Sequence, residues 1–392
     1  MGNDIVCYIE RLEPYIRVTP TFVTPTFVLA ATLSAALALS CGASGPGQLP
    51  HGLLVTAPAM SASRAVHTAT ALPDGRVLVA GGFVERVSAL GAEIYDPGAG
   101  RFSPLPPMIT NRHSHTATLL RDGRVLIAGG YGEGTTTHAT AEIFDPVTNS
   151  FAPTGPLLAA RVGHVAVLLE DGKVVIVGGL GPGWEFLSSA ELYDPATGRF
   201  SSTGSMTVPR ESHVAVRLKD GRVLVAGGHR GRRADITLYA SAETYDPASG
   251  VFTRVGDMRI RRHKHDAVLL PDGQVLITGG SDERDDRGVY DSSELFDPKT
   301  GTFTSGPLMR LGRYKHAGNC LVLRSGLVLI AGGAPQAETY DPRNHTFALV
   351  PGEPRMAGQF SAAALLKSGG ALITGGYGNG GGARSSAWLY RP

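Results

Sequence analysis

The hydrophobic positions of this chain recur as short apolar runs, each closed by a glycine doublet, and show no helical spacing. The stretch "DGRVLVAGG" at 74–82 returns in close form at 122, 171, 220 and 272, and in looser form at 325 and 368. The second glycines of these copies are spaced 48, 49, 49, 52, 53 and 43 residues apart. A period of about 49 residues marks each unit as one repeat of a larger domain, because single units of this kind cannot bury their own apolar faces.

The residue pattern of each unit predicts four strands, which we name A to D in chain order. In the first unit, the runs at 67–72 and 76–82 are separated by Pro-Asp-Gly, a hairpin signal in which Asp and Gly are both expected to have positive φ. Asp96-Pro97 and Gly100 predict a second hairpin between strands C and D. The corresponding turn "DPRNH" at 341–345 is expected to shift this pattern.

Strand B lacks the alternation of a half-buried strand, which predicts that both of its faces are covered. In a four-stranded unit that recurs seven times, the neighbouring units must supply this cover. Four-stranded sheets stacked radially in this way form a β-propeller.

The residues that recur around the glycine doublet resemble the kelch repeat. They are Tyr or Phe followed by Asp-Pro, a later aromatic residue, and Met-x-x-x-Arg-x-x-His at the opening of the next unit. The resemblance covers roughly residues 52–392 and implies an all-β, seven-bladed kelch β-propeller with four antiparallel strands per blade.

The two ends of the repeat region predict how the ring closes. The seventh unit stops at "AWLYRP" after three strands, while the segment at 51–60 has no strands A to C of its own. Leu54 precedes Met60 by the same six residues that separate Phe102 from Met108 in the first strand D. We therefore expect the N-terminal strand to close the last blade, which removes the exposed sheet edges that invite aggregation.

The first 40 residues predict export rather than a folded domain. Residues 27–40 form an apolar run that is short for a membrane span, and 38–41 resemble a bacterial lipobox ending at Cys41, although Ala38 stands where Leu is usual. This pattern predicts a signal peptide at 1–40, lipidation of Cys41, a flexible tether at 41–51 and a propeller at 52–392. The protein would then be secreted across the inner membrane and lipid-anchored in the cell envelope, in contact with the membrane only through the lipid. Ordinary secretion, an uncleaved or cytoplasmic N-terminus and a start codon downstream of Met1 are the alternatives.

Composition narrows the classes of partner. The formal net charge is +2 and no long run of Lys or Arg occurs, so nucleic acid is not expected as a partner. Cys7, Cys41 and Cys320 have neither disulfide-framework nor zinc-site spacing. The acidic loop at 281–292 lacks the spaced ligands and the glycine of a calcium loop. We expect a monomer without cofactor or metal.

Polar residues that recur in six units invite a catalytic interpretation, but one active site has no use for six copies. The seventh unit has Trp388 in place of the glutamate and no histidine near Arg355. We therefore expect one charge-assisted structural network within or between blades, with no catalytic residue. Its members are the arginines 64, 112, 161, 210, 262 and 313, the histidines 67, 115, 164, 213, 265 and 316, and the glutamates 93, 142, 191, 243, 294 and 338.

The loops between strands B and C differ most between units, and they emerge on the same face as the links from D to the next A. Such variable loops are the place to look for ligand recognition. Aromatic and arginine side chains suit a glycan or an acidic protein segment. We also expect Arg232 or Arg233 to pair with Asp285 or Asp286. The candidate ligand-binding residues are Tyr131, Trp184, His229, Arg230, Arg232, Arg233, Arg261, His263, Lys264, Tyr314 and Lys315.

Two functions are compatible with this sequence. The first is a non-catalytic, surface-tethered propeller that binds or scaffolds a protein or glycan through the B-to-C loop face. The alternative is a periplasmic or extracellular carbohydrate-active enzyme, since the chain resembles kelch propellers such as galactose oxidase and the sialic acid mutarotases. That resemblance implies, for the first kind, copper held by Tyr and His beside a Cys-Tyr crosslink, and Cys320 is the only thiol in the propeller region.

Overall fold

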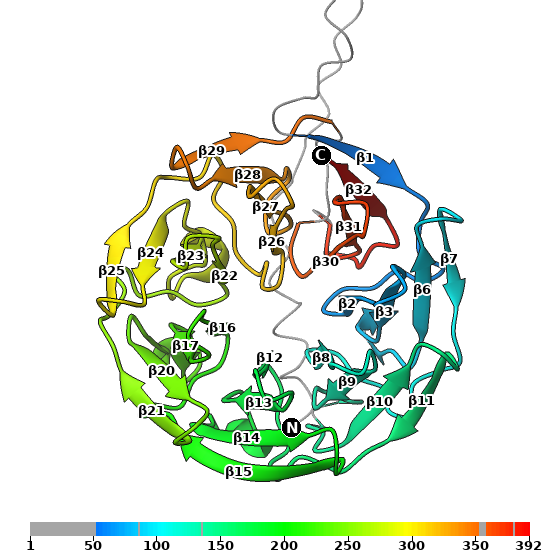
Figure 1. The fold of residues 1–392 in the computed structure, drawn as a ribbon, viewed down its shortest axis with the longest axis horizontal. Helices are drawn as coiled ribbons and strands as arrows, with labels where there is room; N and C mark the ends of the chain where they lie inside the picture. The colour runs from blue at the N-terminus through cyan, green and yellow to red at the C-terminus, as the bar shows by residue number, and fades with distance from the viewer. Residues whose placement is uncertain (1–51, 85–86, 135, 353–357, 379–380) are drawn as a thin grey trace, which may run out of the picture. The chain divides into compact units, whose positions relative to one another are not determined.

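The computed structural model describes residues 52–84, 87–134, 136–352, 358–378 and 381–392. These residues form seven four-stranded antiparallel sheets arranged around a central axis (Figure 1). The expected all-β, seven-bladed propeller is therefore confirmed. The expected signal peptide, Cys41, the tether and Arg355 lie outside the described residues.

In blades one to six the strands follow the chain from the inside of the ring outward, from A to D, whereas β1 (Leu53–Ala57) supplies the outermost strand of blade seven (Figure 1). Blade one contains β2 (Thr68–Ala71), β3 (Val77–Ala80), β6 (Ala92–Asp96) and β7 (Arg101–Pro104). Blade two contains β8 (Thr116–Leu119), β9 (Val125–Ala128), β10 (Ala141–Asp145) and β11 (Ser150–Pro153). Blade three contains β12 (Val165–Leu168), β13 (Val174–Val177), β14 (Ser189–Asp194) and β15 (Arg199–Ser205). Blade four contains β16 (Val214–Arg217), β17 (Val223–Ala226), β20 (Ala242–Asp246) and β21 (Val251–Arg254).

The remaining blades follow the same order. Blade five contains β22 (Asp266–Leu269), β23 (Val275–Thr278), β24 (Ser293–Asp297) and β25 (Thr302–Ser305). Blade six contains β26 (Cys320–Val322), β27 (Val328–Ile330), β28 (Glu338–Asp341) and β29 (Thr346–Leu349). Blade seven contains β30 (Ala362–Leu365), β31 (Ala371–Thr374), β32 (Ala387–Arg391) and β1 (Leu53–Ala57). The B-to-C loops add the short pairs β4 (Phe83–Val84) with β5 (Val87–Ser88) and β18 (His229–Arg230) with β19 (Thr237–Leu238), and three 3₁₀ turns, Pro182–Trp184, Arg233–Asp235 and Asp285–Arg287.

The core lies between adjacent blades. Every residue of β3 is buried, as are those of β9, β13 and the other B strands. Leu78 and Ile94 of blade one pack in one cluster with Val125 and Ile127 of blade two. The continuous apolar runs of strand B are thus explained by cover on both faces, as the sequence predicts.

The N-terminal strand completes the seventh blade. β1 pairs antiparallel with β32 from Leu53 opposite Arg391 to Ala57 opposite Ala387, and both strands lie side by side in Figure 1. Leu54 stands opposite Tyr390, in the place where blade one pairs the rings of Tyr95 and Phe102 at 4.9 Å. The six-residue interval therefore identified the correct register.

The A-to-B turns differ from the expectation in one respect. Leu72 accepts a hydrogen bond from the Gly75 amide at 3.0 Å and donates one to the Arg76 carbonyl at 2.8 Å, which closes a three-residue loop. Gly75 has a φ of 97°, whereas the φ of Asp74 is not positive. The expected positive φ at both residues was wrong, because a three-residue loop needs the left-handed conformation at its last position only.

The C-to-D turns keep one geometry in all their sequences. Gly100, Asn149 and His345 occupy the same turn position with φ of 62°, 53° and 52°. The expected shift at 341–345 is therefore wrong. The ring of His345 reaches the Tyr340 hydroxyl at 2.8 Å, a contact that holds a bulky residue in this conformation.

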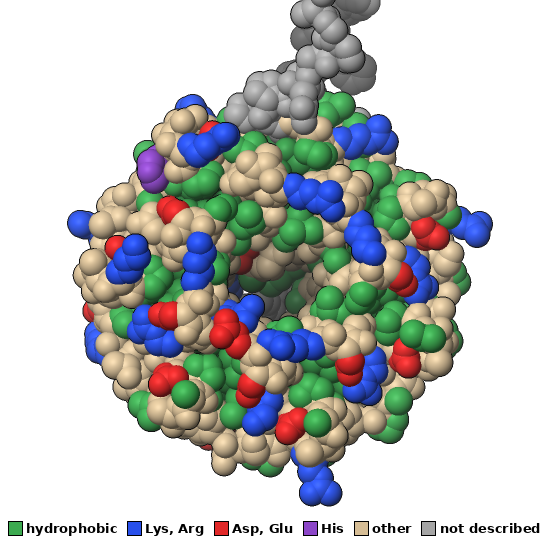
Figure 2. Space-filling view, viewed as in Figure 1, with side chains coloured by type: hydrophobic (Ala, Val, Ile, Leu, Met, Phe, Trp, Pro, Cys, Tyr) green, Lys and Arg blue, Asp and Glu red, His purple; other side chains and the backbone are tan. Residues whose placement is uncertain are grey.

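The surface carries both signs of charge. On the face shown in Figure 2, basic and acidic side chains are interspersed around the central opening. This mixture agrees with the small formal net charge. Among the described residues, no helix is long and apolar enough to cross a membrane.

Candidate binding site at the mouth of the central channel

The repeated arginines and glutamates form one buried ion pair in each of blades one to six. Arg64 donates from Nη2 to Glu93 Oε1 at 2.7 Å and from Nη1 to the Gly81 carbonyl at 2.8 Å, while Glu93 Oε2 accepts the Ser61 amide at 2.8 Å. The same ion pair recurs in blades two to six at 2.6 to 3.0 Å, and its side chains are at most 3% exposed. These groups therefore lie buried inside the blades.

The repeated histidines have a different role from the one expected. They do not bond to the glutamates. Instead, the Nε2 atoms of His115 and His164 lie 3.2 and 3.0 Å from the hydroxyls of Thr68 and Thr116 in the preceding blades. The expected single Arg/His/Glu network is therefore wrong. The arginine and the glutamate pair within one blade, whereas the histidine ring faces the preceding blade.

Replacement of Glu191 by Gln is expected to lower the free energy of unfolding by about 3–5 kcal/mol, because it leaves the Arg161 guanidinium buried without its counter-charge. Burial already lowers the pKa of Arg161, and Glu191 opposes that shift. Urea denaturation measures the change.

The matched control is Asp122→Asn, which breaks the exposed pair with Arg124, where the side chains are 43% and 40% exposed. This change is expected to cost about 0–1 kcal/mol. Equal losses in both variants would contradict a structural role for the buried pair.

A ring of backbone hydrogen bonds surrounds the channel at the end that carries the B-to-C loops. The residue directly before the repeated histidine, or before Ser361 in blade seven, has a positive φ of 52° to 61°. Six amide-to-carbonyl bonds of 2.8 to 3.2 Å link these residues from blade to blade. The ring consists of Val66, Ser114, Gly163, Ser212, Lys264, Lys315 and Phe360. The ring positions thus share one backbone conformation at the mouth of the channel while their residue type varies between blades, and two of them, Lys264 and Lys315, carry a charge.

Two ring positions bring lysines to a shared carboxylate. Lys264 Nζ donates to Asp285 Oδ1 at 2.8 Å, and Lys315 Nζ lies 3.7 Å from Asp285 Oδ2. The lysine side chains are 8% and 10% exposed, whereas that of Asp285 is 39% exposed. The cations therefore belong to the rigid ring, and the carboxylate reaches them from the loop that follows β23.

A row of imidazoles extends this cluster. His229 Nε2 lies 3.3 Å from Glu211 Oε2, and the Nδ1 atoms of His229 and His263 are 3.3 Å apart. His263 Nε2 lies 3.9 Å from Asp285 Oδ1. Burial lowers the pKa of His229, and it lowers the pKa of His263 to about 2, so both rings are neutral near pH 7.

The other end of the cluster is amphipathic. Lys315 Nζ donates to Gln359 Oε1 at 3.2 Å, and Gln359 Nε2 donates to the Tyr314 hydroxyl at 2.8 Å. The same ammonium lies 5.4 Å from the ring centroid of Phe360. Burial, with the neighbouring Lys264 second, lowers the pKa of Lys315 to about 8. We call these residues the channel-mouth cluster: Glu211, His229, His263, Lys264, Asp285, Tyr314, Lys315, Gln359 and Phe360.

The remaining candidates lie outside this cluster. The Arg232 guanidinium stacks on the Trp184 ring at 3.3 Å from its centroid, and Arg230 is exposed. The expected pairing of Arg232 with Asp285 is corrected, because Trp184 holds the arginine and Lys264 holds the carboxylate. The side chain of Arg233 lies outside the described residues.

Tyr131 stands next to the start of blade two. Its backbone bridges to His113, and the two rings are 5.5 Å apart. Burial lowers the pKa of His113 to about 4. This pair belongs to the same loop face as the cluster, but no described contact joins the two groups.

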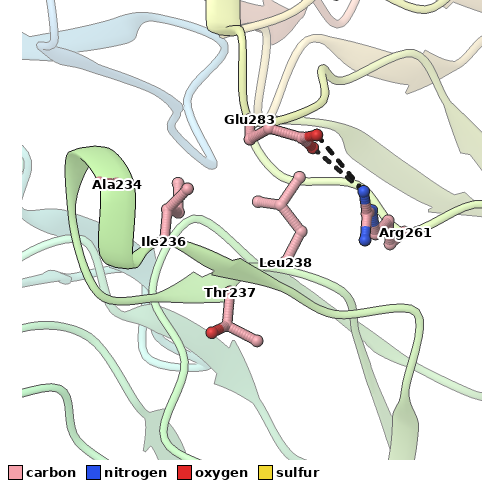
Figure 3. Close-up of a pocket in the computed structure, with 6 residues that line it drawn as sticks. All are labelled: Ala234, Ile236, Thr237, Leu238, Arg261 and Glu283. Atoms are coloured by element: carbon pink, nitrogen blue, oxygen red, sulfur yellow. Dashed lines mark hydrogen bonds and ion pairs between the residues drawn. The ribbon is translucent and has the colours of Figure 1, made fainter.

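A separate hollow of about 360 Å³ lies between the loops of blades four and five (Figure 3). Ile236 and Leu238 line it, and Arg261 and Glu283 form an ion pair at 3.4 Å on its rim. Because this pair neutralises itself and the other lining groups are mostly apolar, the hollow offers little specific recognition. We place the candidate site at the channel mouth.

Comparisons with known proteins agree with the repeat geometry. Residues 160–207 match the family described as Kelch motif. A stretch of 82 residues is 34% identical to Kelch-like protein 38 of Rattus norvegicus and equally identical to that of Homo sapiens, and it covers 20% of this chain and 14% of those proteins. The chain is a kelch-repeat β-propeller.

The kelch propeller also resembles a solved structure described as a novel fungal alcohol oxidase with catalytic diversity among the AA5 family, in complex with copper. The TM-score is 0.67 at 16% identity, and the match covers 88% of this chain and 77% of that chain. At this level of identity, the likeness concerns the fold alone.

Within the described part of the chain, no three His, Cys, Asp or Glu side chains are grouped so as to hold a metal ion. Cys320 is buried on the innermost strand of blade six, where its sulfur lies 3.3 Å from the Thr278 hydroxyl.

Sequence reasoning missed several members of the cluster. Glu211, Asp285, Gln359 and Phe360 were not singled out as ligand-binding residues. Glu211 and Gln359 share a sequence signal with the predicted His263 and Tyr314, because each directly precedes a ring residue. Alignment of the seven units at that position would have found them.

Proposed function

We propose that this kelch propeller is a non-catalytic binding or scaffolding protein that recognises a protein or glycan ligand through the channel-mouth cluster. One observation supports this most: the repeated arginines and glutamates serve the blades, while the polar groups of the cluster are not part of the common repeat and meet at one place. A fold needs the common part, whereas a ligand needs something particular. The face around the mouth also carries aromatic and cationic groups suited to such ligands.

Export and lipid anchoring through Cys41 complete the proposal, supported by the lipobox-like residues 38–41. They would present the propeller to envelope proteins and glycans. Incorporation of labelled palmitate into the full chain, and its loss in Cys41→Ser, tests this part.

The binding proposal is tested by a glycan array and by pull-down of envelope proteins with the full chain. The double variant Lys264→Gln/Lys315→Gln is expected to weaken binding of the ligand found by at least about tenfold, since a charged hydrogen bond contributes about 1.5–3 kcal/mol.

Lys299→Gln, in an exposed C-to-D turn, is the matched control and is expected to bind as the unmodified protein does. Trp184→Ala shows whether the outer loops take part as well. A ligand bound equally by the unmodified protein and the double variant would place recognition elsewhere.

A second candidate is a carbohydrate-active enzyme, which the fold likeness to the alcohol oxidase favours. Turnover of the same bound glycan, measured as product release and abolished by the double variant, would support it over simple binding.

A further inference from the structure

Asp285 enters the channel-mouth cluster from a strained position. It begins a single 3₁₀ turn and has a φ of 58°, a conformation that L-residues rarely adopt. Its carboxylate lies between Lys264, Lys315 and His263. Strain of this kind persists where surrounding contacts hold it, and it is frequent at ligand clamps and switches.

The ring of His263 also lies next to this carboxylate. Its Nδ1 atom is 3.3 Å from the Nδ1 atom of His229, and its Nε2 atom is 3.9 Å from Asp285 Oδ1. His263 Nε2 is buried and has no hydrogen-bond partner among the described residues. It can therefore pair with a ligand group, as acceptor or as donor according to the tautomer of the ring.

The mouth therefore holds two ammonium groups beside one ring nitrogen without a hydrogen-bond partner among the described residues. Two ammonium groups suit a carboxylate, and a hydroxyl close to that carboxylate can donate to the ring nitrogen or accept from it. A sugar acid carries both groups on neighbouring carbons, whereas the side chain of an acidic peptide has the carboxylate without the hydroxyl. Phe360, beside Lys315, adds an apolar face for the C–H groups of a sugar ring.

We propose that the channel mouth binds the carboxylate of an acidic sugar, and that Asp285 is an internal carboxylate which this ligand displaces. The inference rests on the proposed function, because it names the ligand class of the same site. Removal of Asp285 leaves Lys264 and Lys315 without this counter-charge and raises the positive potential at the mouth. The departure of the Asp285 loop also relieves its backbone strain.

The test measures the affinity of the full chain for trigalacturonate and for its methyl ester by titration calorimetry. The acid is expected to bind and the ester is not, since esterification removes the charge and keeps the sugar. Asp285→Asn is expected to tighten binding of the acid by about tenfold, and Lys315→Gln to weaken it by about tenfold, as for single charged hydrogen bonds.

Glu283→Gln is the matched control, because it removes a carboxylate from the same loop but one that pairs with Arg261. It is expected to leave the affinity within about twofold, as for an exposed pair. If Asp285→Asn fails to fold, Asp285→Gly replaces it, since glycine accepts the positive φ without strain.

Three outcomes overturn the inference. They are equal binding of the acid and its ester, no tightening when Asp285 is replaced, and binding of hexa-aspartate in place of trigalacturonate. In the last case the cluster recognises an acidic protein segment, and the proposed function stands. If the array and pull-down ligands are unaffected by the double lysine variant, the proposed function fails with it.

Discussion

Lowering the pH from about 7 to about 5 is expected to unfold the kelch propeller, because six buried histidines stay neutral only while the chain is folded. Burial lowers the pKa of His67 and His164 to about 3, with nearby arginines as the second cause, and holds the pKa of His115, His213, His265 and His316 well below the ordinary value. These histidines bind protons in the unfolded chain below about pH 6.5, while the folded chain excludes them. Their stabilisation is thus complete above the unfolded pKa and is lost as the pH falls toward the folded pKa.

The expected size is large. Each histidine contributes about 1.4 kcal/mol per pH unit once the pH lies well below 6.5, so six together contribute roughly 8 kcal/mol per unit. That approaches the whole stability of a typical protein, about 5–15 kcal/mol. Asp266 acts in the opposite direction, because burial raises its pKa, but it is one group against six.

Circular dichroism and urea denaturation over this pH range measure the effect. His164→Gln is the informative variant, because it removes one titrating group from a blade junction while keeping a polar side chain. Its unfolding free energy is expected to depend less steeply on pH, by about one proton. An unfolding free energy that stays constant between about pH 7 and pH 5 would contradict the buried neutral state.

Replacement of Leu54 by Asp is expected to destabilise the ring by at least about 4 kcal/mol, since it buries an unpaired charge where the chain ends meet. Leu54 is 1% exposed and packs in one cluster with Leu329, Val350, Trp388 and Tyr390. Its amide also donates to the Pro351 carbonyl of blade six at 2.9 Å. Loss of this strand exposes β32 as an open edge, so aggregation is expected together with the lower stability.

The control lies two residues along the same strand. Thr56 is exposed, and Thr56→Asp adds the same charge without burying it. Its thermal midpoint and its state in size-exclusion chromatography are expected to match those of the unmodified protein. If Leu54→Asp behaves like Thr56→Asp, β1 does not secure the ring.

The channel-mouth cluster was predictable only in part. Tyr314, Lys315, His263 and Lys264 were found because they lie in links from strand D to the next strand A, which were expected on the same face as the B-to-C loops. Asp285 was expected to meet an arginine of the preceding loop, and it meets the lysines of the ring instead. Several basic residues of neighbouring loops could pair with Asp285 on charge alone. The three-dimensional paths of the loops decide which of them come within contact distance.

The repeated histidines at the blade junctions were also predictable only in part. The recurrence of His115 and His164 marked them as structural, and the disappearance of both histidine and glutamate in the seventh unit suggested a shared network. The partners are in fact hydroxyls of the preceding blade, some 47 or 48 residues earlier in the chain. No local pattern indicates which side of a blade a ring will face.

The amino-acid sequence by itself determined the number of blades, the order of strands and the closure by Leu54, because each depends on a local pattern or an interval that recurs along the chain. Only the tertiary structure decided that Lys264, Lys315 and Phe360 stand on one ring and that Asp285 reaches it. Residues about one repeat apart meet there because strand A lies innermost in every blade, and contacts between loops follow from their three-dimensional paths, which no periodicity encodes.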